Sequence, residues 1–395
     1  MRILIATSSP YRAFHGQAIF TRNLAEGLIK NGHEVMVIAS SENGKRYETD
    51  YQGVKINALK SVKLGLINPN AILAIFTSRE LEKIIKSFQP DIVHIQDHYP
   101  LCFIATRLAQ KKGLNIIGTN HFMPENLSAY IPIIPKIKKT YSWILWHWMR
   151  CTYDRLNAVV APSQTAAEML KLQSIAPPVL AISCGANTEN FRPLPTINIQ
   201  DIRTRFGINL HRKIFFFVGR VDKEKRLDVV LKAANLMDHS DFQVIIAGNG
   251  AYVKALKRLA KKLGINDKVH FTGFIADEYL PSVLNSIDIF IMPSEAELLS
   301  IATIQAMACS KPILAADAVA LPELVTNGVN GLLFQPGDIN DAARCMVFLV
   351  DHPEQWSTMG AESLQRTKKH NIDKIISEYE MLYHSVLKTN PLTFS

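Results

Sequence analysis

The sequence predicts an α/β protein built from two doubly wound, Rossmann-like parallel-sheet domains. Short apolar runs rich in β-branched residues alternate with longer amphipathic stretches, which is typical of βαβ units. The series is interrupted once, at residues 190–195, where two prolines discourage both helix and strand, and it then resumes. With 395 residues, the chain is also longer than one ordinary hydrophobic core requires.

The first domain is expected to span residues 1–190. Its predicted strands are the apolar runs at residues 3–6, 35–39, 92–95, 116–119, 158–161 and 179–182. Near-continuous apolar strands favour a parallel sheet covered by helices on both faces. Such sheets bind ligands beyond the carboxyl ends of their strands, so functional side chains are expected to follow strands.

The second domain is expected to span residues 191–370 and to repeat this pattern. Its predicted strands lie at residues 214–218, 244–247, 269–271, 287–292, 312–315 and 331–334. We expect the strand ends of the two domains to face a central cleft, which suits an enzyme that joins two substrates away from water. Residues 371–395 contain a helical stretch that could cross back to the first domain.

Cysteine usage and hydropathy indicate the compartment. The five cysteines are scattered and form no CxxC pair, which favours a reduced compartment such as the cytosol. No signal-peptide core opens the sequence, and no apolar run reaches the ~18 residues of a spanning helix. We therefore expect a cytoplasmic protein, either soluble or peripheral at the inner face of the cell membrane.

The formal net charge of +9 calls for an anionic partner. Nucleic acid, an acidic membrane and phosphorylated ligands would all satisfy it. The basic residues are scattered and no recognised nucleic-acid motif is present, so nucleic acid is the least favoured of the three.

Two turns of the second domain have the composition of a phosphate site. Gly219 and Arg220 follow the run at 214–218, with Lys225 shortly after and a helix expected from about Leu227. An arginine fork and a lysine point charge can bind a diphosphate, although a solvated charged turn would have the same composition. Gly248 lies in a second turn, a GxG without the third glycine of a dinucleotide fingerprint, which is a weak signal.

The segment from 287 to 308 gives the strongest signal, since it is predicted as a strand, a polar turn and a helix. We expect the free N–H groups near Leu299, Ser300 and Ile301 to open the helix and bind an anion. Glu297 is placed to accept hydrogen bonds from sugar hydroxyls. Gln305 is expected about two helical turns further along the same face.

At this point the chain resembles glycosyltransferase family 4, which has the GT-B fold, over essentially its whole length. The resemblance rests on landmarks in a fixed order: Gly16, residues 31–35, 91–94 and 184–187, Gly219-Arg220 with Lys225, and residues 297–308. It implies transfer of a sugar from a nucleotide diphosphate sugar, with retention at the anomeric carbon. It also implies that neither a metal nor a cofactor is needed.

The resemblance assigns roles to five of these residues. Arg220 and Lys225 match the basic pair that neutralises the leaving diphosphate, and Glu297 matches the glutamate that contacts the sugar. The family's second glutamate, which binds the ribose, is replaced by Gln305, which would lose charge-assisted bonds. His121, after the run at 116–119, matches the active-site histidine, although a structural histidine remains the alternative.

Two further segments of the first domain are candidate binding elements. Gly16 precedes a helix and would allow close approach of a phosphate or an acceptor hydroxyl, unless it is a plain helix start. Residues 131–150 hold three of the four tryptophans beside a lysine cluster, a mixture suited to an anionic membrane interface. The competing interpretation is a core helix with a basic end. The residues expected to touch acceptor or membrane are Lys136, Lys138, Lys139, Trp143 and Trp146.

The functional prediction is a hexosyltransferase that uses a UDP- or GDP-sugar donor. Residues 120–126, 296–303 and 320–325 resemble the branch of the family that glycosylates diacylglycerol-type lipids. A lipid acceptor is therefore expected, with a surface polysaccharide as an alternative within the enzyme class. Gln305 leaves open a second class, a non-catalytic subunit that binds nucleotide sugars.

Overall fold

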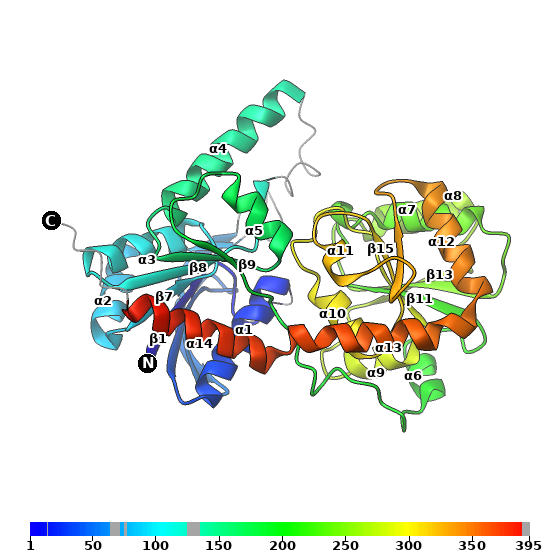
Figure 1. The fold of residues 1–395 in the computed structure, drawn as a ribbon, viewed down its shortest axis with the longest axis horizontal. Helices are drawn as coiled ribbons and strands as arrows, with labels where there is room; N and C mark the ends of the chain where they lie inside the picture. Colours follow the sequence, from blue (N-terminus) through cyan, green and yellow to red (C-terminus); the bar gives the residue numbers. More distant parts are fainter. Residues whose placement is uncertain (14, 64–71, 75–76, 125–134, 389–395) are drawn as a thin grey trace. The chain divides into compact units, whose positions relative to one another are not determined.

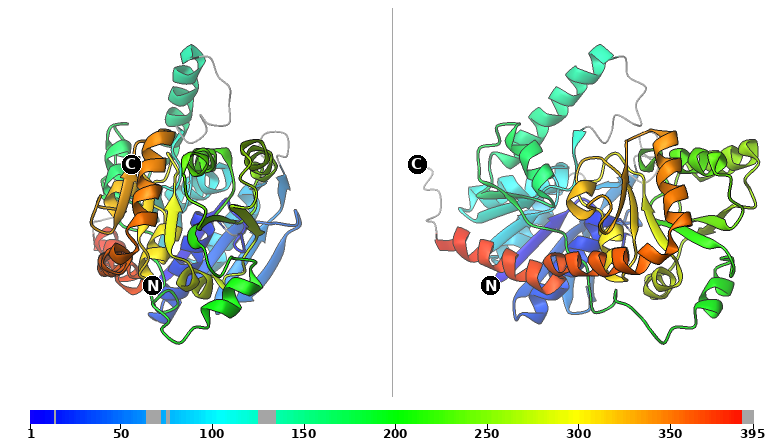
Figure 2. Two further views of the ribbon diagram at one scale, coloured as in Figure 1. Left: turned by 90° about the vertical axis from the view of Figure 1, so that its right-hand side faces the viewer. Right: turned by 45° about the vertical axis from the view of Figure 1, so that its right-hand side comes forward.

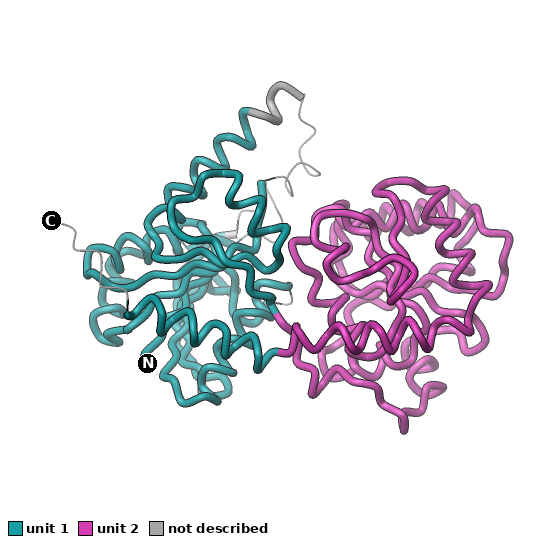
Figure 3. Tube along the Cα trace, viewed as in Figure 1, with its two compact units in different colours: residues 1–128, 132–184, 372–395 teal, residues 129–131, 185–371 magenta. Residues whose placement is uncertain are grey.

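The structure, a computed structural model, describes residues 1–13, 15–63, 72–74, 77–124 and 135–388. The chain forms two compact units (Figure 3). Unit 1 comprises residues Met1–Ser128, Pro132–Cys184 and Ile372–Ser395, and unit 2 comprises Gly185–Asn371. Within the described ranges, no helix is long and apolar enough to cross a membrane.

Unit 1 is built on an eight-stranded sheet with the order β10-β9-β8-β7-β1-β2-β4-β3. Its strands are β1 (Arg2–Thr7), β2 (Glu34–Ser40), β3 (Tyr47–Tyr51), β4 (Val54–Leu59), β7 (Ile92–Ile95), β8 (Asn115–Thr119), β9 (Ala158–Ala161) and β10 (Val179–Ala181). β1 lies between β2 and β7, with Ile3 opposite both Val35 and Ile92. The six strands expected from apolar runs are all present and parallel to their neighbours.

The edge of this sheet departs from the simple βαβ pattern. β3 pairs antiparallel with β4, so the two strands form a hairpin at the edge. A second, two-stranded sheet is formed by β5 (Ser61–Lys63) and β6 (Ile72–Ala74). β3 has no buried residue, which is why it shows no apolar run in the sequence.

Helices cover both faces of the unit 1 sheet (Figures 1 and 2). They are α1 (Gly16–Lys30), α2 (Ser78–Phe88), α3 (Pro100–Lys111), α4 (Pro135–Tyr153), α5 (Gln164–Lys171) and α14 (Ile372–Lys388). α14 packs beside α1, and the side chain of Ile376 fills the space next to Gly27. The C-terminal helix therefore shares the core of unit 1.

Unit 2 contains a six-stranded, fully parallel sheet with the order β13-β12-β11-β14-β15-β16. Its strands are β11 (Lys213–Val218), β12 (Phe242–Ala247), β13 (Val269–Gly273), β14 (Ile289–Met292), β15 (Ile313–Ala316) and β16 (Gly331–Phe334). Each coincides with an expected apolar run to within two residues. The four central strands β11, β12, β14 and β15 are buried almost throughout, whereas the edge strands β13 and β16 are only partly buried.

The helices of unit 2 pack in two groups. α7 (Leu227–Leu236) lies against α8 (Val253–Leu263) and α12 (Ile339–Asp351). α10 (Ile301–Ala308) packs with α13 (Trp356–Thr367) and with α9 (Leu280–Ser286), which also contacts α6 (Ile199–Arg205). The short elements are α11 (Leu321–Leu324) and the 3₁₀ turns η2 (Lys223–Lys225), η3 (Pro353–Gln355) and η4 (Lys368–His370).

Candidate active site

The strand order of unit 2 reverses between β11 and β14. The chain runs outward from β11 through β12 to β13 and then returns to β14 on the other side of β11. In parallel sheets of this kind, ligands bind at the carboxyl ends of the strands beside the reversal. Residues 219–226 follow β11 and residues 293–300 follow β14, so the candidate donor-site residues lie at this point.

The cations that follow β11 are held by carboxylates. Arg220 donates to Asp222 and to Glu224, each at 2.7 Å. Lys225 forms a salt bridge with Glu297, and both side chains are largely buried. The structure thus brings Arg220, Lys225 and Glu297 into one ion-pair network. Neither Asp222 nor Glu224 was singled out from the sequence, because an acidic residue among lysines is equally typical of a solvated turn.

Arg226 belongs to the basic run after β11, but the sequence assigned it no role in the site. Its backbone is left-handed (φ 50°), between η2 and α7, and its guanidinium group forms a salt bridge with Glu295. A non-glycine residue in this conformation is uncommon and costs of order 1–3 kcal/mol, and such residues concentrate at functional sites. The only signal in the sequence was the basic run itself.

Gly248 is required by chain packing. A Cβ atom at this position would lie 1.9 Å from the carbonyl oxygen of Gly219, and φ is +120°. The two turns pair through backbone bonds from Gly219 N–H to Ala247 and from Val221 N–H to Asn249. This close approach accounts for Gly248 without a bound nucleotide.

The helix expected from residues 299–302 begins slightly later. Ser300 is the N-cap of α10, and its Oγ accepts a hydrogen bond from the backbone N–H of Thr303 at 3.2 Å. Leu299 therefore precedes the helix, while Ile301 is its first residue. Ser300 and Thr303 are both buried, so the cap is shielded from water.

Glu297 and Gln305 do not share a helix face, which corrects the prediction. Glu297 lies in the loop before the cap, because three residues separate it from the first residue of α10. Gln305 is the fifth residue of α10 and is half-buried. Its side-chain amide forms no hydrogen bond within the described part of the chain.

In unit 1 the strand order reverses between β1 and β7, and a buried carboxylate lies there. Asp97 accepts hydrogen bonds from the N–H and hydroxyl of Ser8 at 2.8 and 2.7 Å. It also accepts from the amide of Gln17 at 2.8 Å and from Tyr99 N–H at 3.1 Å. Gln17 follows Gly16, the first residue of α1, so Asp97 holds the first turn of this helix in place.

His121 lies just beyond the carboxyl end of β8, in the position expected for it. Its Nε2 lies 3.0 Å from Oε1 of Gln96, and its ring packs on Phe20. The Gln96 side chain thus holds the imidazole ring of His121 in place. Burial, with a smaller effect of His15, lowers the pKa of His121 to about 3, so the imidazole is neutral at physiological pH.

The candidate membrane segment is only partly a surface. Trp143 is 66% exposed on α4 and stacks on His147. Trp146 is buried, with 6% exposed, so its assignment to a membrane-facing surface is wrong and its indole belongs to the core of unit 1. The side chains of Lys136, Lys138 and Lys139 lie outside the described residues.

The described residues contain no cluster of three or more His, Cys, Asp or Glu side chains that could hold a metal ion. The ion-pair network after β11 and β14 instead offers basic groups for a diphosphate and a carboxylate for hydroxyl groups.

Comparison with known proteins gives matches in both units. The family model described as Glycosyltransferase Family 4 matches residues 14–190, and the model described as Glycosyl transferases group 1 matches residues 198–366. The chain is 26% identical over 384 residues to alpha-monoglucosyldiacylglycerol synthase of Streptococcus pneumoniae, covering 96% of this chain and 85% of that protein.

Two further similarities extend over most of the chain. Sulfoquinovosyl transferase SQD2 of Arabidopsis thaliana is 24% identical over 386 residues, covering 93% of this chain and 70% of that protein. The crystal structure of HepE from Anabaena in complex with UDP-glucose superposes with a TM-score of 0.78 at 17% identity, covering 98% of this chain and 100% of that one.

Proposed function

The chain belongs to glycosyltransferase family 4 and has the GT-B fold, and from this premise we propose that it is a retaining, metal-independent hexosyltransferase acting on a membrane lipid. Its donor is a UDP- or GDP-hexose, and its acceptor is a hydroxyl of a diacylglycerol-like lipid. The protein acts as a peripheral enzyme at the cytosolic face of an anionic membrane.

The salt bridge between Lys225 and Glu297 is the observation that carries this proposal. It lies where the strand order of unit 2 reverses, beside Arg220. A nucleotide sugar presents a diphosphate, which the ammonium and guanidinium groups bind, and sugar hydroxyls, which the carboxylate binds. Binding of the donor would thus break the ion pair, with Lys225 turning to the diphosphate and Glu297 to the sugar hydroxyls. The site is already ordered before the donor binds.

The same groups support transfer with retention. Negative charge that develops on the departing diphosphate is stabilised by Arg220, Lys225 and the N–H groups that open α10. That diphosphate, on the same face of the sugar as the incoming hydroxyl, takes up the acceptor's proton. His121, whose imidazole is neutral, orients a sugar hydroxyl and does not supply a proton.

Three observations favour a lipid acceptor. The relative from Streptococcus pneumoniae is named for a glucosylated diacylglycerol. Trp143 and Ile144 are exposed on α4, where indole and aliphatic groups would enter the interfacial zone of a bilayer. The net charge of +9 favours a surface of anionic headgroups.

Gln305 favours one second candidate, a non-catalytic subunit that binds nucleotide sugars. In place of the family's ribose-binding glutamate, a neutral amide would bind the ribose more weakly. Transfer to a surface polysaccharide is the alternative acceptor within the enzyme class.

The test measures nucleotide release from UDP-glucose, UDP-galactose and GDP-mannose by the purified protein in the presence of chelator. Each donor is supplied with and without vesicles that contain diacylglycerol, and the anomeric configuration of the product is determined by NMR. Lipid-dependent release of one nucleotide with an α-linked product is expected. Nucleotide binding without turnover of any donor would instead support the non-catalytic subunit, and turnover abolished by chelator would contradict metal independence.

A further inference from the structure

A cluster of aromatic side chains surrounds His98 in unit 1. The ring centroid of His98 lies 4.6 Å from that of Tyr99, 5.5 Å from Phe122, 5.7 Å from Trp148 and 6.1 Å from Tyr153. The side chains come from the loops after β7 and β8 and from α4, so three elements converge on one histidine. We call these five residues the aromatic cluster.

The aromatic cluster adjoins His121. Phe122 is the next residue in the chain, and Gln96, two residues before His98, is the hydrogen-bond partner of His121. A molecule bound against Phe122 would therefore lie beside the residue proposed to orient the sugar. The cluster stands at the carboxyl ends of β7 and β8, where a doubly wound sheet binds its ligands.

Two polar side chains beside the aromatic cluster already make hydrogen bonds. Asn120 accepts from Tyr153 at 3.0 Å and donates to the sulfur of Met123 at 3.7 Å. Asp97 already accepts from Ser8, Gln17 and Tyr99. What the rings of the aromatic cluster offer a ligand is mainly apolar contact.

The aromatic cluster contains a buried polar atom that has no partner among the described residues. Nδ1 of His98 is buried and forms no hydrogen bond with any described residue. Burial lowers the pKa of His98 to about 4 against the opposing effect of Asp97, so the ring is neutral at physiological pH. A neutral imidazole nitrogen among aromatic rings suits one oxygen atom of a ligand whose remainder is hydrocarbon.

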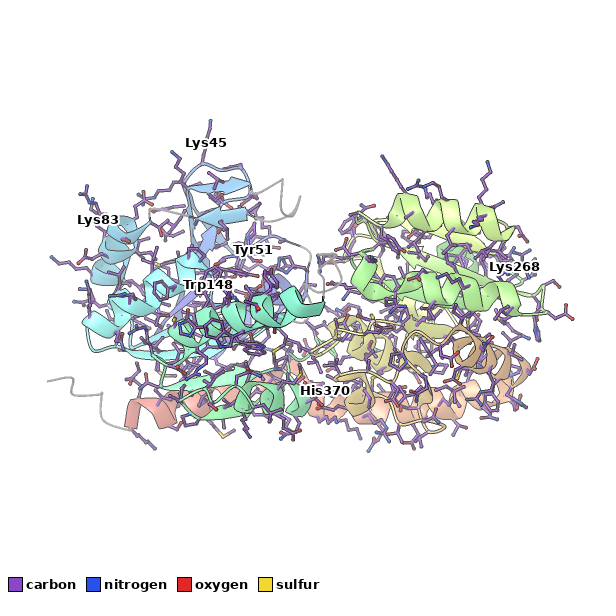
Figure 4. The ribbon with its side chains drawn as sticks, turned by 90° about the horizontal axis from the view of Figure 1, so that it is seen from above. Lys45, Tyr51, Lys83, Trp148, Lys268 and His370 are labelled. Atoms are coloured by element: carbon purple, nitrogen blue, oxygen red, sulfur yellow. The ribbon has the colours of Figure 1, made fainter. Side chains whose placement is uncertain are left out.

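The aromatic cluster continues along α4 toward the solvent. Trp148, which is labelled in Figure 4, lies on α4. Its side chain is 37% exposed, and Ile144, one helical turn earlier, is half exposed beside Trp143. Apolar side chains thus extend from an exposed stretch of the helix to the rings that surround the buried Nδ1 of His98. This continuity matches a lipid with one polar end and a long hydrocarbon body.

We propose that the aromatic cluster is the acceptor subsite, in which Tyr99, Phe122 and Trp148 hold the first methylenes of a diacylglycerol-like lipid and His98 binds one of its glycerol oxygens. This inference rests on the lipid acceptor of the proposed function. Tyr99, Phe122 and Trp148 provide the contacts, and α4 provides the route by which the hydrocarbon chains reach them.

The experiment uses the full chain and dioctanoylglycerol, which is soluble enough to be tested without vesicles. Trp148→Ala and Phe122→Ala should raise the KM for this acceptor by about tenfold or more, because each removes a large apolar contact. The KM for the donor should change by less than about twofold, since unit 2 binds it. Trp148→Phe, which keeps a ring, should recover most of the loss.

Leu172→Ala is the matched control, because Leu172 is an exposed apolar residue of unit 1 that lies outside the aromatic cluster. It should leave both KM values unchanged, and thermal unfolding of every variant should show that it is folded. Unchanged acceptor KM values in both alanine variants, with transfer intact, would overturn the aromatic cluster alone. Donor turnover by the wild type without transfer to any diacylglycerol would instead remove the lipid acceptor of the proposed function, and this inference with it.

Discussion

The ammonium group of Lys225 forms a salt bridge with the carboxylate of Glu297, which lies 72 residues further along the chain. The pair joins the loop after β11 to the loop after β14, at the place where the strand order of unit 2 reverses. The side chain of Lys225 is 16% exposed and that of Glu297 is 12% exposed. Because little water reaches either group, each charge is stabilised mainly by the other. A ligand that carries both a diphosphate and hydroxyl groups can replace both partners at once.

Replacement of Lys225 should therefore impair transfer. We expect Lys225→Met to lower kcat by about 10²–10³-fold, because one group that stabilises the charge of the departing diphosphate is lost. Lys223→Met is the matched control, since Lys223 belongs to the same 3₁₀ turn but is exposed. Steady-state kinetics at saturating acceptor would decide this, and equal kcat values in the two variants would show that Lys225 has no special role.

Introducing a carboxylate at position 305 should strengthen nucleotide binding. Gln305→Glu restores the charge-assisted bonds to ribose that an amide lacks, which are worth roughly 1 kcal/mol, or about fivefold in Kd. Gln305→Ala should weaken binding, because it removes both acceptor and donor. Calorimetric titration with UDP and GDP tests this. Weaker binding by Gln305→Glu than by the wild type would mean that position 305 does not contact the ribose.

The positions of several short parallel strands could be predicted from the sequence alone. β7, β9 and β16 begin and end at the predicted residues, because each is a short, mainly apolar run that ends at a polar residue or a proline. β3 was missed for the complementary reason. It lies at the sheet edge with no buried residue, so its presence depends on its pairing with β4.

The contacts between side chains of the site could be predicted only in part from the sequence. Arg220, Lys225 and Glu297 were expected at strand ends, but their carboxylate partners Asp222 and Glu224 depend on how η2 turns. Trp146 was expected at a surface because periodicity cannot show which face of an amphipathic helix packs inward. The start of α10 was predicted one to two residues too early, since Leu299 and Ile301 are equally apolar. Only the hydrogen bond from the N–H of Thr303 to Oγ of Ser300 identifies Ser300 as the N-cap.

Val319 is strained, and relieving that strain should stabilise unit 2. This β-branched residue adopts a left-handed conformation (φ 50°) between β15 and α11, next to Ala320, whose N–H donates to the carbonyl of Glu297 at 3.2 Å. The conformation costs an L-residue about 1–2 kcal/mol, and glycine avoids it at an entropic cost of about 0.5–1 kcal/mol. Val319→Gly should therefore raise the free energy of unfolding by roughly 0.5–1 kcal/mol.

Val319→Ala separates conformational strain from the loss of the larger side chain. Alanine keeps a Cβ atom, so most of the strain should persist and the gain should be smaller than with glycine. Urea unfolding of the two variants beside the wild type gives both values. A destabilised Val319→Gly would show that the valine side chain contributes more by packing than its backbone costs.

The buried histidine His94 should make unit 1 sensitive to acid. Its ring is fully buried, with Nδ1 bound to Tyr383 and Nε2 bound to Thr119, each at 2.8 Å. Burial and the neighbouring His121 lower the pKa of His94 to about 3. The unfolded chain, in which a histidine titrates near 6.5, therefore binds more protons than the folded chain between these two values.

It follows that the contribution of His94 to the free energy of unfolding is fully present above pH ~6.5. This contribution is lost as the pH falls toward ~3, by up to about 1.4 kcal/mol per pH unit. Urea unfolding at pH 7, 6 and 5 measures this slope, and tryptophan fluorescence reports mainly on unit 1, which holds three of the four tryptophans. His94→Gln should be less stable at pH 7, because it cannot make both bonds, but should lose less stability per pH unit. His98 and His121 also titrate, so only the difference between the slopes of variant and wild type isolates the effect of His94. Equal slopes of the free energy of unfolding against pH would mean that His94 is protonated in the folded state.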